Sequence, residues 1–307
     1  MHAPLGVIGE ALIDIVVDAD GTTTEFVGGS PANVAVGLAR LGHPCWLASH
    51  WGGDARGQRI AALLAAEGVR TTHGSANAAR TSTATAHLDA EGVASYDFDI
   101  TWELAPDSVP DQAGVHVHTG SIAATLEPGA HTIAEFLARA RADRTISYDP
   151  NARPTLMGHP DVVRPHIEAL IAMSDVVKAS VEDVDWLYPG LSRQQVLALW
   201  ARLGPSLCLL TAGADGVVGL VNDQEFSHPA QAVQVADTIG AGDSFTSGLL
   251  SGLADAGLLG GPAERERLRT TDIEQIMPAV TRALACAAIT VSRDGANPPR
   301  RDELATD

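Results

Sequence analysis

The sequence predicts an α/β fold in which a doubly wound, mostly parallel sheet has helices on both faces and a small β lid is inserted. From residue 115 onward, short apolar strand patterns alternate with helical patterns, which indicates a parallel sheet covered by helices. Two hairpin patterns, in segments of about 14–28 and 81–102, fall outside this rhythm. The chain of 307 residues, 45% of them hydrophobic, can bury a large core. We therefore expect a single domain over 1–307, with a lid built from those two segments.

The charge balance and the cysteines restrict the partners and the location of the chain. Lys and Arg number 20 and Asp and Glu number 38, so the formal net charge is −18, which excludes a general nucleic-acid binder. Uncharged apolar runs stay well short of the ~20 residues that a bilayer requires, and the N-terminus does not resemble a signal peptide. The cysteines, Cys45, Cys208 and Cys286, lie in apolar surroundings, which suits buried thiols. We expect a cytoplasmic protein without nucleic-acid or membrane partners.

The first third of the chain mixes extended and helical patterns. An apolar run over 7–17, a turn at Asp20-Gly21 and an extended stretch over 22–27 predict strand, hairpin and strand. The next helix should have Ser30 as its N-cap and Pro31 at its first position. The other patterns in this third are a helix over 32–41, a strand over 45–50, a helix over 57–67 and a hairpin of 81–88 and 94–98 around a turn at 89–92.

The remainder of the chain alternates between strand and helix. We expect strands over 115–118, 145–148, 175–178 and 207–210, and helices over 131–141, 160–173, 181–187, 194–203, 242–256 and 273–291. The stretch over 260–267 reads as a surface excursion.

The strongest local motif is Asp237-Thr238-Ile239-Gly240-Ala241-Gly242-Asp243, followed by an apolar helical pattern. Its glycines permit a tight turn with outward N–H groups, and the helix dipole adds positive potential, so the turn can hold an anion. A carboxylate at that position suggests a general base that accepts a proton from an incoming hydroxyl. The alternative is that Asp243 only caps the helix.

A second motif, Gly28-Gly29-Ser30-Pro31-Ala32-Asn33, combines close backbone approach with an amide side chain that can grip vicinal hydroxyls. Taken alone, it is equally typical of a turn followed by a cap. The single lysine of the chain, Lys178, does not follow a Gly-rich loop, so a P-loop is excluded. The Gly-Ala-Gly motif also lacks the third glycine of a dinucleotide-binding fingerprint.

With Gly52-Gly53-Asp54 and Asp149-Pro150-Asn151-Ala152-Arg153, these motifs resemble the ribokinase-like (PfkB) carbohydrate kinases over nearly the whole chain. The resemblance implies ATP-dependent phosphorylation of a sugar hydroxyl and a β lid over the sugar. It implies that Asp243 is the catalytic base and that Gly240, Ala241 and Gly242 form the anion hole. The implied sugar contacts are Asp14, Gly28, Gly29, Asn33, Phe98 and Arg153, and the implied ATP contacts are Ser180, Thr211, Gly213 and Gly216. The implied monovalent-cation loop comprises Asp237, Ile239, Thr290, Arg293 and Gly295.

One motif departs from the family pattern. The usual Asn-x-x-Glu is Ser180-Val181-Glu182-Asp183 here, so either Glu182 or Asp183 can organise the waters of Mg²⁺. Arg153 follows a strand end, where ligands collect in α/β sheets, although a surface ion pair is the alternative. His116 and His118 are expected to be structural or surface residues. Trp102 is expected either to pack in the core or to contact the substrate, and the sequence favours neither.

The most similar members of the resembling family are bacterial fructokinases, so we expect a kinase that phosphorylates a primary hydroxyl of fructose. Kinases of ribose, 2-keto-3-deoxygluconate or a nucleoside are the alternatives, and a catalytically silent sugar or nucleotide sensor is another. ATP, Mg²⁺ and K⁺ are the implied co-substrate and ions, and a homodimer through the lid is the implied assembly. Lys and Arg are absent from 6–39 and from 81–138, which favours a neutral acceptor.

Overall fold

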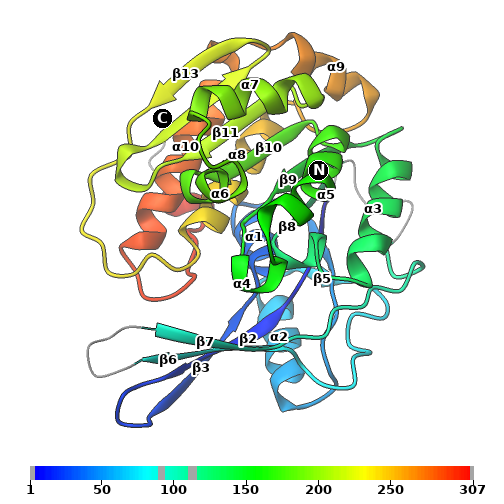
Figure 1. Ribbon diagram of the computed structural model, residues 1–307, viewed down its shortest axis with the longest axis vertical. Helices are drawn as coiled ribbons and strands as arrows, with labels where there is room; N and C mark the ends of the chain where they lie inside the picture. The colour runs from blue at the N-terminus through cyan, green and yellow to red at the C-terminus, as the bar shows by residue number, and fades with distance from the viewer. Residues whose placement is uncertain (1–3, 89–93, 110–115, 305–307) are drawn as a thin grey trace.

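The computed structural model describes residues 4–88, 94–109 and 116–304, and it has two β-sheets (Figure 1). The nine-stranded sheet has the order β13-β12-β11-β10-β9-β8-β1-β4-β5, and the four-stranded sheet has the order β3-β2-β6-β7. The strands from β5 to β11 in the large sheet are parallel, and β12 and β13 are antiparallel. The predicted fold class is therefore confirmed. Residue 115 and the turn expected at 89–92 lie outside the described residues.

The large sheet is assembled from strands spread over the chain. They are β1 (Leu5–Ile8), β4 (Cys45–Ala48), β5 (Arg70–Thr71), β8 (His116–Gly120), β9 (Thr145–Asp149), β10 (Val176–Ser180), β11 (Leu207–Thr211), β12 (Val217–Val221) and β13 (Gln224–His228). The small sheet consists of β2 (Leu12–Val17), β3 (Thr23–Gly28), β6 (Thr83–Leu88) and β7 (Ala94–Asp99), and it projects from one end of the main body (Figure 1).

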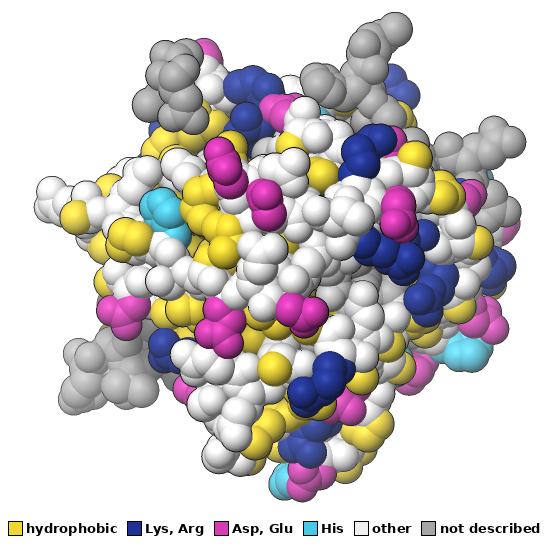
Figure 2. Space-filling view, turned by 90° about the horizontal axis from the view of Figure 1, so that it is seen from above, with side chains coloured by type: hydrophobic (Ala, Val, Ile, Leu, Met, Phe, Trp, Pro, Cys, Tyr) yellow, Lys and Arg dark blue, Asp and Glu magenta, His cyan; other side chains and the backbone are white. Residues whose placement is uncertain are grey.

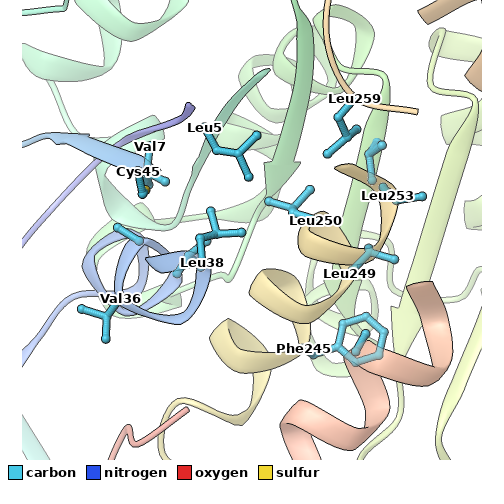
Figure 3. Close-up of a cluster of buried hydrophobic side chains, with 14 of the residues drawn as sticks. Leu5, Val7, Val36, Leu38, Cys45, Phe245, Leu249, Leu250, Leu253 and Leu259 are labelled. Atoms are coloured by element: carbon cyan, nitrogen blue, oxygen red, sulfur yellow. The ribbon is translucent and has the colours of Figure 1, made fainter. Parts of the chain in front are cut away.

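Helices cover both faces of the large sheet because neighbouring residues of each strand point to opposite faces. One face packs against α1 (Ser30–Arg40), α2 (Ala55–Ala66), α8 (Ala241–Asp255), α9 (Pro262–Thr270) and α10 (Ile273–Val291). The other packs against α3 (Gly129–Ala140), α5 (Pro160–Met173), α6 (Val181–Leu187) and α7 (Arg193–Leu203), and the short α4 (Pro154–Met157) precedes α5. Figure 3 shows Leu38 of α1 and Leu250 of α8 packed near Leu5 of β1.

The apolar run over 7–17 does not form one strand. It breaks at Gly9, so that β1 belongs to the large sheet and β2 to the small one. Gly9 has a φ of 156°, and a Cβ there would lie 2.2 Å from Pro31 Cγ, so only glycine fits this crossing. The segment from Gly9 to Ala11 is thus the first connection between the two sheets.

The small sheet is fastened to α2. Ile13 and Ile15 of β2 share a buried apolar cluster with Ile60 of α2. Asp54, the N-cap of α2, accepts hydrogen bonds from Thr81 N at 2.9 Å and from Thr81 Oγ1 at 2.6 Å. The Gly52-Gly53-Asp54 motif therefore ties the start of the second lid segment to the main body.

Several sequence predictions need correction or completion. The stretch over 260–267 lies mostly at the surface, as expected, but from Pro262 onward it forms the first part of α9, whose Leu268 is fully buried. Sequence patterns did not identify the hairpin of β12 and β13, which extends the large sheet at its antiparallel edge. The three cysteines are free and buried, as expected.

The described helices include none that is long and apolar enough to cross a membrane. On the face drawn in Figure 2, Lys and Arg side chains are interspersed with Asp and Glu. The absence of a nucleic-acid partner stays a prediction.

Candidate active site

The carboxyl ends of the parallel strands meet the N-terminus of α8. Gly240, the residue before α8, has the left-handed φ of 74°, and a Cβ there would lie 2.6 Å from Ala296 Cβ. Glycine is therefore required for this turn, which leaves the first N–H groups of α8 without intrahelical partners. Such a helix start attracts anions, which is the role that the resemblance assigns to Gly240, Ala241 and Gly242.

Asp243 lies in the first turn of α8 and is 8% exposed. Its Oδ1 accepts a hydrogen bond from Ser30 Oγ at 2.6 Å, and its Oδ2 accepts one from Asn33 Nδ2 at 2.8 Å. No side chain caps α8, so the interpretation of Asp243 as a helix cap is wrong. Ser30 is also not the N-cap of α1, because Gly29 occupies that position and the Ser30 hydroxyl binds Asp243 instead.

Asp14 of β2 is the acidic residue that the small sheet contributes. A Cβ on Gly28 would lie 1.9 Å from Asp14 Oδ2, so the carboxylate lies directly against the Gly28 backbone. Burial raises the pKa of Asp14 to about 6; Asp243 adds to the rise and Arg153 opposes it. Gly29, with a φ of 104°, passes so close to Glu10 that a Cβ there would lie 2.5 Å from the Glu10 carbonyl oxygen. The two glycines thus bring β2 and the connection before it close to the start of α1.

Glu10 is a buried carboxyl group that the sequence analysis did not assign to the site. It is 5% exposed, lies in the connection between β1 and β2, and accepts a hydrogen bond from Ala123 N at 3.2 Å. Burial raises its pKa from the ordinary value of 4.5 to about 7. The signal in the sequence was an acid within an apolar run, one position after the glycine that ends β1.

Aromatic side chains lie on the same face of the small sheet as Asp14. Asp14 is paired with Phe26 on one side and Ala84 on the other, and Ala84 is paired with Phe98, so the four side chains share one face. Phe98 stacks on Tyr96 with ring centroids 6.1 Å apart and an interplanar angle of 10°. Phe26 is 50% exposed and Tyr96 is 60% exposed, which leaves apolar surface beside the carboxylate.

Arg153 precedes α4 and is exposed. Its Nη1 donates to Asn151 Oδ1 at 2.8 Å and to the Ala152 carbonyl oxygen at 3.0 Å. Because its charge opposes the rise in the pKa of both Asp14 and Glu10, it lies near the connection between the sheets. The alternative of a surface ion pair finds no acidic partner within salt-bridge distance among the described residues.

Lys178 is the residue that sequence reasoning set aside. It lies on β10, is 5% exposed, and its Nζ donates to Asp149 Oδ2 at 2.9 Å. A Cβ on Gly242 would lie 3.1 Å from the same Nζ, so the ammonium group lies beside the first turn of α8. Thr246 Oγ1 is 3.4 Å from Asp149 Oδ2. The signal was a single lysine in an acidic chain, near the end of a buried strand.

The residues expected to contact ATP lie at the ends of β10 and β11. Ser180 caps α6 by accepting from Asp183 N at 3.1 Å, and Thr211 is the last residue of β11. Gly213 and Gly216 have φ values of 52° and 93°, and a Cβ on Gly216 would lie 2.1 Å from the His228 carbonyl oxygen. The loop after β11 therefore needs both glycines, whatever it binds.

The two candidate acids for Mg²⁺ differ sharply. Glu182 is exposed, whereas Asp183 is 7% exposed. The Asp183 carboxylate accepts hydrogen bonds from Ala152 N and Ser180 N, both at 2.7 Å. A carboxylate has about four acceptor positions, so Asp183 can still accept from water molecules. Groups of three or more His, Cys, Asp or Glu that could hold a metal directly are absent from the described part of the chain.

The residues of the expected cation loop come together beside α8. Asp237 Oδ1 accepts from Ile239 N at 3.0 Å, and Asp237 Oδ2 accepts from Gly295 N at 2.9 Å. Thr290 is fully buried, and its carbonyl oxygen accepts from Arg293 N at 3.0 Å. The Asp237 carboxylate thus braces the two loops, and backbone carbonyl oxygens of such loops are the kind of donor that a monovalent ion needs.

The remaining expectations concern histidines and tryptophans. His116 and His118 are buried and both bond to Ser147 Oγ at 2.9 Å, so they are structural residues of the sheet. Trp102 is 3% exposed and packs against Gly129, where a Cβ would lie 2.1 Å from Trp102 Nε1. These contacts make Trp102 a packing residue.

Comparisons with known proteins agree with this architecture. Residues 4–303 match the family described as pfkB family carbohydrate kinase. The sequence is 33% identical to a fructokinase of Klebsiella pneumoniae, with 99% of each chain covered. It is 30% identical to an aminoimidazole riboside kinase of Salmonella typhimurium, with 94% of this chain and 89% of that protein covered. A fructokinase double mutant from Vibrio cholerae O395, in a form with bound fructose, ADP and potassium, aligns with a TM-score of 0.82 at 26% identity over 96% of this chain and 95% of that chain.

The mostly parallel sheet, the acid at the glycine-bounded helix start and the family match together place the chain among the carbohydrate kinases. The chain belongs to the pfkB family of carbohydrate kinases. It is a carbohydrate kinase similar in sequence and in fold to fructokinases.

Proposed function

We propose that this kinase transfers the γ-phosphoryl group of ATP to a primary hydroxyl of a neutral sugar, with fructose as the first candidate. The observation that carries the proposal is the setting of Asp243. Its two carboxylate oxygens are held by Ser30 and Asn33 of α1, at the start of a helix that can bind an anion. The silent-sensor alternative would not need an acid in that position.

The proposed reaction uses Asp243 as a general base. The acceptor hydroxyl transfers its proton to the Asp243 carboxylate while its oxygen attacks the γ-phosphorus, and the bond to the β–γ bridging oxygen breaks to release ADP. The first N–H groups of α8 point at the charge that develops on the phosphoryl group. The hydrogen bonds from Ser30 and Asn33 orient the carboxylate for this transfer.

The charges around the site favour a neutral acceptor. Asp14 and Asp243 would repel a carboxylate or phosphate on the sugar, since both lie close enough for their charges to interact. The arginines that contact the small sheet are paired with its own acids, Arg56 and Arg59 with Glu25 and Arg80 with Asp99, which leaves Arg153 as the counter-charge near Asp14. Sugar hydroxyls can instead donate to Asp14. These features support fructose and ribose over 2-keto-3-deoxygluconate.

A nucleoside is the second candidate, because of the aromatic surface beside Asp14. The stacked pair of Tyr96 and Phe98, together with Phe26, offers flat faces on which a heteroaromatic base can stack. The relative from Salmonella typhimurium is named for a riboside acceptor, which also supports this candidate.

We propose Mg²⁺ and K⁺ as the ions of the reaction. Mg²⁺ would be held through water by Asp183, with Glu182 as the exposed alternative, and it would neutralise charge on the phosphates. K⁺ would be held by carbonyl oxygens of the loops that Asp237 braces. The potassium named for the Vibrio cholerae fructokinase supports this assignment.

We also propose a homodimer through the small sheet. Its edge strands are β3 and β7, and they carry the half-exposed Phe26 and Tyr96. Unpaired edges with apolar side chains are suited to pairing with a second copy. Light scattering on the purified chain, with Tyr96→Ser as the variant, tests this assembly. The cytoplasmic location is kept as a prediction.

The experiment that tests the function is a panel of acceptors with coupled detection of ADP. Fructose, ribose, adenosine, aminoimidazole riboside, 2-keto-3-deoxygluconate and fructose 1-phosphate are compared at one pH with Mg²⁺ and K⁺ present. The highest kcat/KM for fructose supports the first candidate, and the highest for a riboside replaces it with the second. ADP release that none of these acceptors accelerates would contradict the proposal.

A further inference from the structure

A single ammonium group lies at the anion-binding helix start. Lys178 is the only lysine of the chain. Its side chain is 6% exposed, and its Nζ lies beside Gly242, where a Cβ would be 3.1 Å away. Asp243, the proposed base, is the next residue of the same turn, and its charge acts on Lys178. A buried cation therefore borders the place where the phosphoryl group would pass from ATP to the sugar.

The hydrogen bonds of Lys178 are incomplete. Its ammonium group has three N–H donors. Within the described ranges, Asp149 Oδ2 is the only acceptor at hydrogen-bond distance, at 2.9 Å. Burial alone would lower the pKa of Lys178, but the carboxylates of Asp149, Asp183 and Asp243 together keep the pKa above its ordinary value. The ammonium group is therefore charged, and it has N–H donors that can still bond to a ligand.

Asp149 fixes the orientation of the Lys178 side chain. It is the last residue of β9, is 2% exposed, and follows Tyr148, whose partner on β10 is Val177, the residue before Lys178. Taking two charges out of water is costly, and a buried pair is weak evidence for stability by itself. A pair of apolar residues would fill the same position in the sheet without the cost of burying two charges. A purely structural role therefore does not explain why Lys178 and Asp149 lie beside α8.

We propose that Lys178 is a further catalytic residue, which donates hydrogen bonds to the γ-phosphoryl group of ATP as it is transferred, and that Asp149 is its positioning residue. This inference rests on the proposed function, because it needs ATP as the phosphoryl donor. Lys178 adds a full positive charge to the partial charges of the α8 N–H groups. In a P-loop protein, the lysine of the loop contacts the phosphates. This chain has no P-loop, and among the residues of the described site Lys178 supplies the ammonium group.

The first test compares nucleotide binding in Lys178→Met, whose side chain has similar length without charge. Calorimetry without acceptor measures the Kd of ADP and of the β,γ-imido analogue of ATP, both with Mg²⁺. We expect the Kd of the analogue to rise at least ~10-fold and that of ADP to change less than ~3-fold. Equal changes for both nucleotides, or no change, would overturn a contact with the γ-phosphoryl group. Arg267→Met on α9, which removes one exposed charge far from the site, is the control.

The second test separates catalysis from simple charge balance at Asp149. Lys178→Met should lower kcat by at least ~10²-fold with little change in the KM of the sugar. The double variant Asp149→Asn with Lys178→Met removes both charges. It should regain the thermal stability that the single variant loses but stay as slow as the single variant. Recovery of kcat to within ~10-fold of the wild type would show that Lys178 only neutralises Asp149.

Asp149→Asn by itself tests the positioning role. It should lower kcat in the chain that keeps Lys178 and have no further effect when it is combined with Lys178→Met, a non-additivity that a structural role does not produce. Additive effects would refute the assignment. If the wild type phosphorylates none of the acceptors, the proposed function fails. The affinities for ADP and for the ATP analogue still show whether Lys178 contacts the γ-phosphoryl group.

Discussion

Asp243→Asn is the substitution that separates proton acceptance from shape. An asparagine can keep both contacts of the aspartate, because its amide oxygen can accept from Asn33 Nδ2 and its amide nitrogen can donate to the rotatable Ser30 hydroxyl. The side chain is 8% exposed and its surroundings need not change. What is lost is the negative charge and, with it, the ability to accept a proton from the acceptor hydroxyl.

The expected magnitudes follow from those contacts. Two charge-assisted hydrogen bonds become neutral ones, a loss of about 1 kcal/mol each. The neighbouring charges act in both directions, because removing the charge of Asp243 relieves its repulsion of Asp14 and Asp149 but also ends its attraction for Lys178. We expect the free energy of unfolding to fall by no more than about 2 kcal/mol. Removal of a general base lowers kcat by about 10²–10⁴-fold, which is roughly 3–5 kcal/mol in the barrier.

The assay measures kcat and KM by coupled detection of ADP, together with urea unfolding and ATP binding. Ser30→Ala is the matched control, because it removes one hydrogen bond from Asp243 and leaves the base in place. Its kcat should stay within about 10-fold of the wild-type kcat, because a 10-fold change corresponds to about the free energy of one hydrogen bond. A wild-type kcat in Asp243→Asn, or an equal loss in both variants, would refute proton acceptance by Asp243.

Three further predictions concern ions, acceptors and pH. Replacing K⁺ by a large organic cation at fixed ionic strength should lower kcat, since the ion would fix the loops braced by Asp237, and equal rates would remove that site. Neutral acceptors should have a higher kcat/KM than fructose 1-phosphate, and the reverse order would contradict the charge argument around Asp14. Burial raises the pKa of Glu10 from 4.5 to about 7, so the folded state binds the proton more tightly than the unfolded state. Wild-type stability should therefore decline as pH rises from about 4.5 to 7, and Glu10→Gln should remove a decline of up to roughly 3 kcal/mol in urea unfolding. Parallel stability curves for the two proteins would contradict this assignment.

Local sequence patterns were reliable where a helix has clear caps or a clear apolar period. The helices over 160–173, 181–187 and 273–291 have the bounds that their patterns indicate, because apolar periodicity and caps act within the element itself. The patterns failed where pairing decides the structure. Gly9 divides one apolar run between two sheets, and β12 and β13 extend the large sheet as a hairpin that pairs along the edge of β11.

The site shows the same division between local and tertiary causes. Glycine turns are local requirements of backbone conformation, so the start of α8 and the loop at Gly216 could be recognised from the sequence. The partners of Asp243 could not, because Ser30 lies 213 residues away and its position suggested a cap of its own helix. A polar side chain such as that of Ser30 can bond to a local or to a distant group. Which of the two it binds depends on which parts of the backbone pack against it.

By itself, the sequence determined an acidic α/β chain with two glycine-rich motifs, one that ends in an acid, Asp243, and one that ends in an amide, Asn33. Only the tertiary structure decided that α1 holds Asp243, that Asp14 lies against Gly28, and that Lys178 lies beside Gly242 rather than apart from the site. The physical reason is that carboxyl ends of parallel strands converge at one edge of the sheet. Residues that are far apart in the chain become neighbours there, and spacing in the sequence carries no record of their contacts.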